Sequence, residues 1–189
     1  MNELITQYES TIRLTCFAAV LASVMVWQWR RPKRAYSQSL AARWLNNFGM
    51  VILNTIVLRL AFPVAAVGAA LFAAERGWGL FNQLGWPAWL EVTVCILALD
   101  ALIYAQHVVF HKVPVLWRIH RMHHIDLDFD VSTGLRFHPV EILISMAVKW
   151  AAILALGAPA LAVLVFEILL NAFPMFNHAN AGLPAPVDR

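Results

Sequence analysis

The chain has 189 residues, of which 61% are hydrophobic and only 13% are charged, and its formal net charge is +3. Soluble domains are about half apolar and about a quarter charged, so this composition excludes an ordinary water-soluble globular protein. A chain this short leaves much of its surface exposed, which means that the excess of apolar side chains faces lipid. Its length favours one membrane-embedded domain over residues 1–189.

Apolar stretches along the chain predict an all-α fold, a multi-pass transmembrane helical bundle. They cover residues 11–29, 50–73, 88–110, 140–156 and 159–173. Cations follow the first stretch rather than precede it, so we interpret it as a retained span and not as a secretory signal. The last two stretches are short and are separated by Gly157, Ala158 and Pro159. They are expected to form a helical hairpin that either crosses the membrane or dips in and returns.

The basic residues predict the orientation in the membrane. The loop between the first two spans holds five of them: Arg30, Arg31, Lys33, Arg34 and Arg43. The next loop, 74–87, has only one arginine and one glutamate, so the positive-inside rule makes the first loop cytosolic. A nucleic-acid patch is the alternative, but cations directly after an apolar span are typical of a topology signal, and no nucleic-acid partner is expected. Counting spans onward places all seven histidines on the cytosolic side.

A polar face is predicted on the third helix. Asp100, Tyr104, His107 and His111 recur at three- and four-residue spacing and therefore share that face. Two histidines four residues apart can present two imidazoles to one ion. Asp100 and Tyr104 lie deeper in the span, where an ionisable group is costly. Asp100 is expected either to orient a ligand histidine or to pair with Arg59 of the second span.

A second histidine cluster follows at His120, His123 and His124, and on a helix all three can face one way. Two further histidines, His138 and His178, lie outside these clusters. His138 precedes Pro139 and is interpreted either as the start of a helix or as a metal ligand. His178 falls on the predicted histidine side and is expected to be a ligand.

The histidines predict a metal centre. Nitrogen ligation without thiolates suits iron, zinc, copper or nickel. Cys16 and Cys95 lie inside apolar runs, so neither a disulfide framework nor a thiolate site is expected. A structural zinc ion needs about four ligands, so five to seven histidines favour two ions.

Four segments then resemble the fatty acid hydroxylase superfamily, also called the sterol desaturase family. They are Asp100 to His111, PVLWRIHRMHH at 114–124, LRFHPVE at 135–141 and FNHAN at 176–180. The resemblance covers roughly residues 95–180. Members are integral membrane di-iron oxygenases that hydroxylate or desaturate lipids with O₂ and electrons from a partner protein.

The resemblance implies which residues form the site. The metal ligands would be His107, His111, His120, His123, His124, His178 and, as an accessory position, His138. Asp100, Tyr104 and Asn180 would support them. Two iron ions are implied, with zinc as a substitute, together with a fatty acyl or sterol-like substrate. A redox donor would dock on the cytosolic side at Lys112, Arg118 and Arg121.

The family pattern ends in a further histidine cluster, which does not occur before Arg189. The sequence therefore predicts N-terminal transmembrane helices over 1–87 and a partial, C-terminally truncated hydroxylase-like domain over 88–189. The membrane is expected to be a bacterial inner membrane or the endoplasmic reticulum. Two alternatives remain: a haem-binding electron carrier, and a catalytically inactive relative.

Overall fold

A computed structural model describes residues 2–183, with side chains from residue 4 onward. The described chain is helical apart from one isolated β-bridge between Pro32 and Ala181. The predicted end of the domain, residues 184–189, lies outside the described residues. The helices in chain order are α1 (Asn2–Arg30), α2 (Leu40–Ala61), α3 (Ala66–Arg76), α4 (Phe81–Leu84), α5 (Ala88–Lys112), α6 (Pro114–His124), the 3₁₀ turn η1 (Thr133–Leu135), α7 (Pro139–Leu156) and α8 (Ala160–Asn177).

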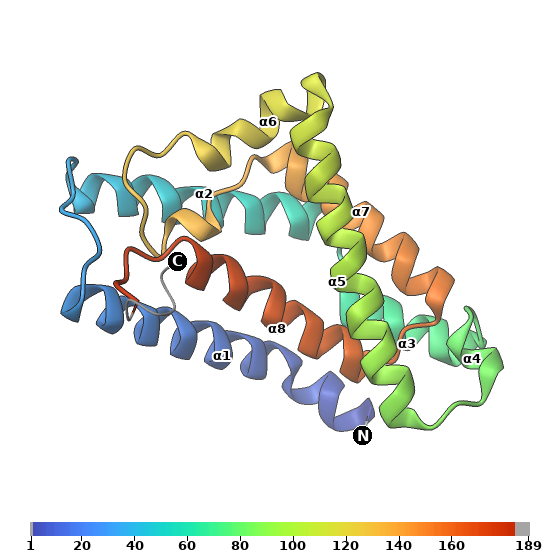
Figure 1. The fold of residues 1–189 in the computed structure, drawn as a ribbon. Helices are drawn as coiled ribbons and strands as arrows, with labels where there is room; N and C mark the ends of the chain where they lie inside the picture. The colour runs from blue at the N-terminus through green and yellow to red at the C-terminus, as the bar shows by residue number, and fades with distance from the viewer. Residues whose placement is uncertain (1, 184–189) are drawn as a thin grey trace.

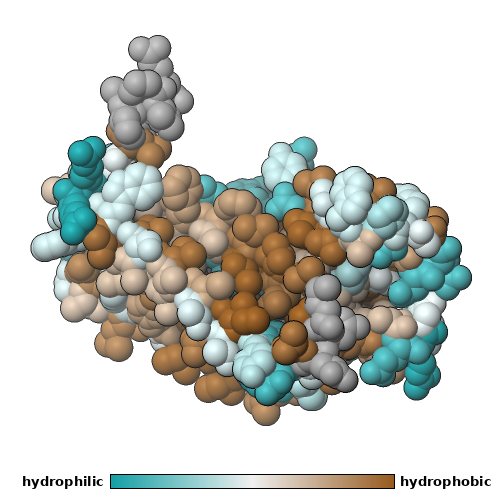
Figure 2. All heavy atoms as spheres, turned by 90° about the horizontal axis from the view of Figure 1, so that it is seen from below, coloured by the Kyte–Doolittle hydropathy of each residue, from teal (hydrophilic) through white to brown (hydrophobic). Residues whose placement is uncertain are grey.

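Five segments of the described chain are long and apolar enough to cross a membrane. They are Leu4–Arg30, Leu40–Leu84, Ala88–Lys112, Pro139–Leu156 and Ala160–Asn177. Large apolar side chains such as Leu45, Ile52 and Leu60 are exposed on them. Figure 2 shows a face on which hydrophobic side chains form a broad continuous area, with hydrophilic ones toward its margins. The prediction of a multi-pass helical membrane bundle is confirmed.

The second predicted span, 50–73, is not one helix. α2 starts ten residues earlier, at Leu40, where the Ser39 hydroxyl accepts a hydrogen bond from the Ala42 N–H. It ends at Ala61, because Pro63 has no N–H and forces extended backbone on Phe62, whose φ is −128° and ψ 82°. α3 then begins as a separate helix.

Proline and glycine set the other boundaries largely as predicted. α5 ends at Lys112, and Pro114 occupies the start of α6. Gly157, at φ 63°, ends α7, and α8 follows directly after Pro159. Pro174 lies inside α8, which continues through it to Asn177.

The helices α7 and α8 do not form a closed hairpin. α8 runs beside α1 in the same direction and also packs on α5 and α3, whereas α7 packs on α3 and α2 (Figure 1). Small residues of α3, among them Ala66, Ala69 and Ala70, are completely or almost completely buried here. Small side chains let helix backbones approach closely in a membrane, where packing is the main attraction between helices.

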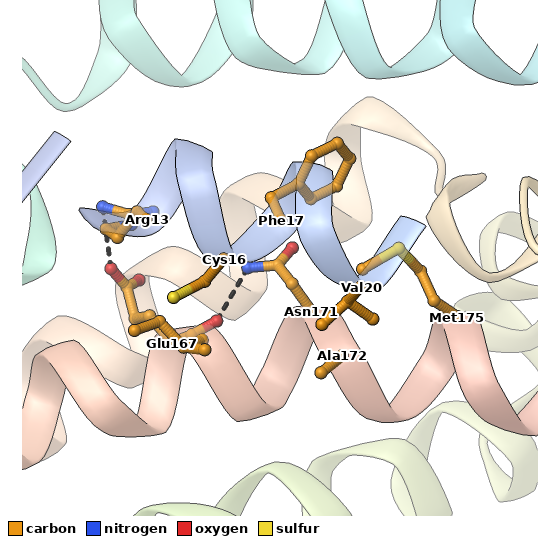
Figure 3. A pocket seen from close by; sticks show the side chains of 9 residues that line it. Arg13, Cys16, Phe17, Val20, Glu167, Asn171, Ala172 and Met175 are labelled. Carbon is orange, nitrogen blue, oxygen red and sulfur yellow. Dashed lines mark hydrogen bonds and ion pairs between the residues drawn. The ribbon is translucent and has the colours of Figure 1, made fainter. Parts of the chain in front are cut away.

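A chain of charges joins α1, α7 and α8 inside the bundle. The Glu167 carboxylate of α8 lies 2.5 Å from the Lys149 Nζ of α7 and 3.0 Å from an Arg13 nitrogen of α1. Arg13 also pairs with Glu9 at 2.9 Å. A cavity of about 10 Å³ beside Glu167, which Cys16 also lines, is just large enough for one water molecule (Figure 3). Lipid cannot solvate charged side chains, so the pairing of these charges with one another offsets the cost of placing them inside the bundle.

We predict that Gly79→Ala destabilises the protein much more than Gly85→Ala. Both glycines have positive φ, 91° and 59°, but a Cβ at Gly79 would lie 2.0 Å from the Gly157 nitrogen, whereas one at Gly85 meets open space. The expected losses are about 3 kcal/mol for Gly79→Ala and about 1 kcal/mol for Gly85→Ala, measured by unfolding in detergent. Equal losses would mean that the Gly79–Gly157 contact does not constrain the bundle.

Candidate metal centre

Four histidines converge where α5 meets α6. The break at Val113 and Pro114 turns the chain so that α6 packs back against the end of α5 (Figure 1). The His111 Nε2 lies 3.1 Å from that of His107 and 3.2 Å from that of His120. The His120 and His124 Nε2 atoms are 3.1 Å apart. The ligand atoms of the four side chains all lie within 4.8 Å of one another, which is an arrangement that one metal ion can occupy.

A buried carboxylate fixes the central histidine. The Oε1 of Glu141, in the first turn of α7, lies 2.7 Å from the Nδ1 of the fully buried His120. A carboxylate accepts hydrogen bonds, so Nδ1 donates and the Nε2 lone pair points at the other three imidazoles. Metal-binding histidines commonly have such a carboxylate partner. Sequence reasoning did not assign this role to Glu141, which is 21 residues from His120 and gives no local spacing signal.

A second pair of histidines adjoins the first group. The His123 Nδ1 donates to the Arg136 carbonyl at 3.0 Å, and the His178 Nδ1 donates to the Pro174 carbonyl at 2.8 Å. Both rings therefore keep a free Nε2 lone pair, and their centroids are 4.6 Å apart. The His123 ring also stacks on Phe137 at 4.4 Å.

The expectation that His120, His123 and His124 all face one way was therefore only partly right. His120 and His124 face the α5 histidines, whereas His123 turns toward the end of α8. The two groups still touch, because the His123 ring lies 5.0 Å from that of His124 and 5.7 Å from that of His120.

Two histidines outside the spans, His123 and His124, are held neutral. Burial, together with the neighbouring His178, lowers the pKa of His123 to about 3. Burial, together with His120 and His111, lowers the pKa of His124 to about 4. Neutral imidazole is the form that binds metal ions, so near pH 7 both side chains are in the ligand form.

The other predicted site residues lie apart from these contacts. The His138 ring caps α7, its Nδ1 accepting the Val140 N–H at 3.1 Å, which matches the helix-start interpretation. The Asn180 side chain bonds to the backbone of Arg34 in both directions, at 3.0 and 2.8 Å. Asp100 and Tyr104 are exposed, and among the described residues neither has a hydrogen bond to a histidine. The alternative ion pair of Asp100 with Arg59 is absent from the described residues too.

Arg43 holds the segment that links α6 to α7. Sequence reasoning placed it in the cytosolic loop, but it lies in α2 and is only 5% exposed. Its guanidinium pairs with Asp126 at 3.1 Å and with Asp130 at 2.9 Å, and it donates to the Asp128 carbonyl. Burial alone would raise the pKa of Asp126, but hydrogen bonds and charge from Arg43 hold that pKa below its usual value.

This linking segment also connects the basic loop to the histidines. The Ser37 N–H and hydroxyl both donate to Asp128, at 2.9 and 3.0 Å. Pro32 forms the β-bridge with Ala181, three residues beyond His178. The basic loop, the segment after α6 and the end of α8 thus lie together at one end of the molecule (Figure 1).

We predict that Glu141 raises the affinity of the site for metal. Glu141→Gln keeps an acceptor for the His120 Nδ1 but removes the charge, and Glu141→Ala removes both. Loss of a partner behind a ligand histidine typically lowers metal affinity about 10- to 100-fold, so we expect the smaller effect for glutamine and the larger for alanine. Metal titration of the purified protein measures this, with Glu91→Gln on α5 as the control. Unchanged affinity in both Glu141 variants would exclude the role.

The chain is similar in sequence to known proteins over the region that contains these histidines. Residues 92–188 match the family model described as fatty acid hydroxylase. The chain is 27% identical over 185 residues to ornithine lipid hydroxylase OlsE of Rhizobium tropici, a match that covers 96% of this chain and 54% of that protein. A stretch of 44 residues is 46% identical to fatty acid hydroxylase vlmA of a Lecanicillium species, covering 22% of this chain and 12% of that protein.

The chain therefore spans about half the length of the first relative and a small part of the second. No solved structure matches the chain. The family model covers just over half of the 189 residues and includes all seven histidines. The chain belongs to the fatty acid hydroxylase family.

Proposed function

We propose that the chain carries the di-iron centre of a membrane-bound lipid hydroxylase. The observation that carries the proposal is the convergence of the His107, His111, His120 and His124 Nε2 atoms within 4.8 Å. Lone pairs crowded at 3.1–3.2 Å repel one another unless a proton or a cation lies between them. A metal ion satisfies all four at once, so the donor set fits a metal.

Two groups of histidines support two ions. His107, His111, His120 and His124 would hold one ion, and His123 with His178 would contribute to a second beside it. Nitrogen donors suit iron and also zinc, so zinc remains a substitute. Bound iron supplies the O₂ activation that oxygen insertion into an unactivated C–H bond requires.

The protein's own part is to hold and expose the centre. His120 and His123 are buried and fixed from behind, whereas His107, His111 and His124 are exposed on the face that α5 and α6 form. A lipid carbon would approach from that open face. The names of both relatives include a hydroxylase acting on a lipid or a fatty acid, which favours hydroxylation over desaturation and an acyl chain over a sterol-like substrate.

We further propose that the histidines face the cytosol. They share one end of the molecule with the basic loop, and the positive-inside rule makes that loop cytosolic. A membrane-impermeant thiol reagent should then label a Ser37→Cys variant only from the cytosolic side. Labelling from the opposite side would reverse the orientation.

An acidic redox donor would dock on the same side. Lys112, Arg118 and Arg121 are exposed around the histidine corner and offer positive charge to such a partner. Reduction of the centre by a soluble donor should slow as ionic strength rises. Rates that are independent of salt would exclude docking through these cations.

The test of the function is metal content together with lipid oxidation. The purified protein should contain two iron ions per chain, show no Soret band and transfer one ¹⁸O atom from ¹⁸O₂ to a lipid. A Soret band would instead indicate the haem alternative, although four Nε2 atoms this close leave no space for a macrocycle between them. Zinc alone without lipid oxidation would indicate a non-catalytic relative.

A further inference from the structure

A hollow of about 530 Å³ lies at the end of α1 and the start of α2, and its described lining contains no histidine. Its size falls in the range of small-molecule sites, about 300–1,000 Å³. Because it lies between the end of one span and the start of the next, it is at the level of the membrane surface. Its lining residues are Met25, Gln28, Trp29, Pro32, Lys33, Arg34, Ala35, Tyr36, Leu40 and Trp44.

The lining combines positive charge with apolar and aromatic surface. Lys33 and Arg34 are the charged residues of the described lining, which contains no carboxylate. Met25, Trp29 and Trp44 supply the apolar part, and Trp29 remains 80% exposed. An anion with an attached hydrocarbon chain matches both parts.

Contacts from distant segments fix the walls of the hollow. Asn180 holds the Arg34 backbone from both sides, at 3.0 and 2.8 Å. The Gln28 side-chain Oε1 accepts a hydrogen bond from the Val131 N–H at 3.1 Å. The Trp44 indole N–H donates to Asp130 at 3.3 Å. The hollow is therefore formed by the fold before any ligand enters, which lowers the cost of binding.

We propose that this hollow binds one anionic phospholipid of the surrounding membrane. The phosphate would lie against Lys33 and Arg34, and an acyl chain would lie along Met25, Trp29 and Trp44. No histidine is among the described lining residues, so the proposal treats the bound lipid as a resident of the hollow and not as the molecule that is oxidised. The proposal therefore does not depend on the oxidative function.

Two pairs of cations at and after the end of α1 allow a matched test. Lys33 and Arg34 line the hollow, whereas Arg30 and Arg31 belong to the same basic cluster but do not line it. Both double substitutions to glutamine remove two charges. Native mass spectrometry and titration in detergent would measure the binding of phosphatidylglycerol, phosphatidylcholine and inorganic phosphate.

We expect one phosphatidylglycerol per chain and much weaker binding of phosphatidylcholine. Lys33→Gln with Arg34→Gln should lower the affinity for phosphatidylglycerol about thirtyfold, and Arg30→Gln with Arg31→Gln by about threefold or less. Trp29→Ala should lower the affinity about tenfold. The control Trp89→Ala, which alters a tryptophan on α5 that is 70% exposed, should leave it unchanged.

Three results would overturn the proposal. Equal losses in the two double variants would mean diffuse attraction to the whole basic cluster. If phosphatidylcholine bound as tightly as phosphatidylglycerol, the site would not distinguish lipids by headgroup charge. Inorganic phosphate binding as tightly as the lipid, with no effect of Trp29→Ala, would make the hollow a site for soluble anions. Helix content and metal content of each variant show whether it has folded.

Discussion

Replacing His120 by alanine is expected to remove metal from the protein and to abolish lipid oxidation. His120 is the central member of the cluster, because its Nε2 lies 3.2 Å from that of His111 and 3.1 Å from that of His124. Loss of a ligand should cost more than the roughly 100-fold upper limit for loss of an outer partner such as Glu141. Elemental analysis after gel filtration measures the metal, and product analysis measures the activity.

Two further variants separate metal binding from folding. His120→Ala leaves the buried Glu141 carboxylate without its partner, which costs stability by itself. His124→Ala removes an exposed ligand without creating a buried charge, and it should also lose metal. His138→Ser keeps a side chain that can cap α7, and it should retain metal. Full metal content in His120→Ala and His124→Ala would contradict the centre, and metal loss in a folded His138→Ser would make His138 a ligand.

The second large effect is expected when Arg43 is replaced, and it concerns the stability of the folded protein. Arg43→Met should lower the free energy of unfolding by about 3–5 kcal/mol, the usual cost of leaving buried charges without their partner. Asp130 is fully buried and Asp126 nearly so, and both pair with Arg43. Thermal or denaturant unfolding in detergent would measure the loss.

Arg59 provides the matched control on the same helix. It is exposed and has no ion pair among the described residues, so Arg59→Met should change stability by less than about 0.5 kcal/mol. Arg43→Met should also weaken metal binding, because the segment that Arg43 holds leads to the Arg136 carbonyl, which orients His123. Equal stabilities of the two variants would show that the pairing of Arg43 with Asp126 and Asp130 is not structural.

Local patterns in the sequence were enough to predict most of the long helices and the shared face of His107 and His111. Hydrophobic runs depend only on neighbouring residues, and so does the four-residue spacing on one helix. Pro63 lies inside the predicted span 50–73, where the apolar run continues on both sides of it. Its missing N–H is a local signal that should have ended the second helix.

Contacts between segments that are distant in the sequence could not be predicted from such local patterns. The direction of His123 depends on the carbonyl of Arg136, and the role of Glu141 depends on how α7 packs on α6. Arg43 looked like a solvated loop cation, because its partners Asp126 and Asp130 are more than eighty residues away. Such partners are brought together only by the tertiary fold, so they cannot be inferred from composition or from residue spacing.

The ion pair between Arg13 and Glu167 has a consequence for how the chain enters the membrane. α1 is synthesised first and pairs its Arg13 with Glu9 of the same helix, whereas Glu167 is made 154 residues later. An arginine at the centre of a span weakens insertion by about 3 kcal/mol, and one nearer the end of a span weakens it less. α1 alone should therefore insert with low efficiency during translation and become fixed only when α8 arrives. Release of the nascent chain before α8 should leave α1 partly outside the bilayer.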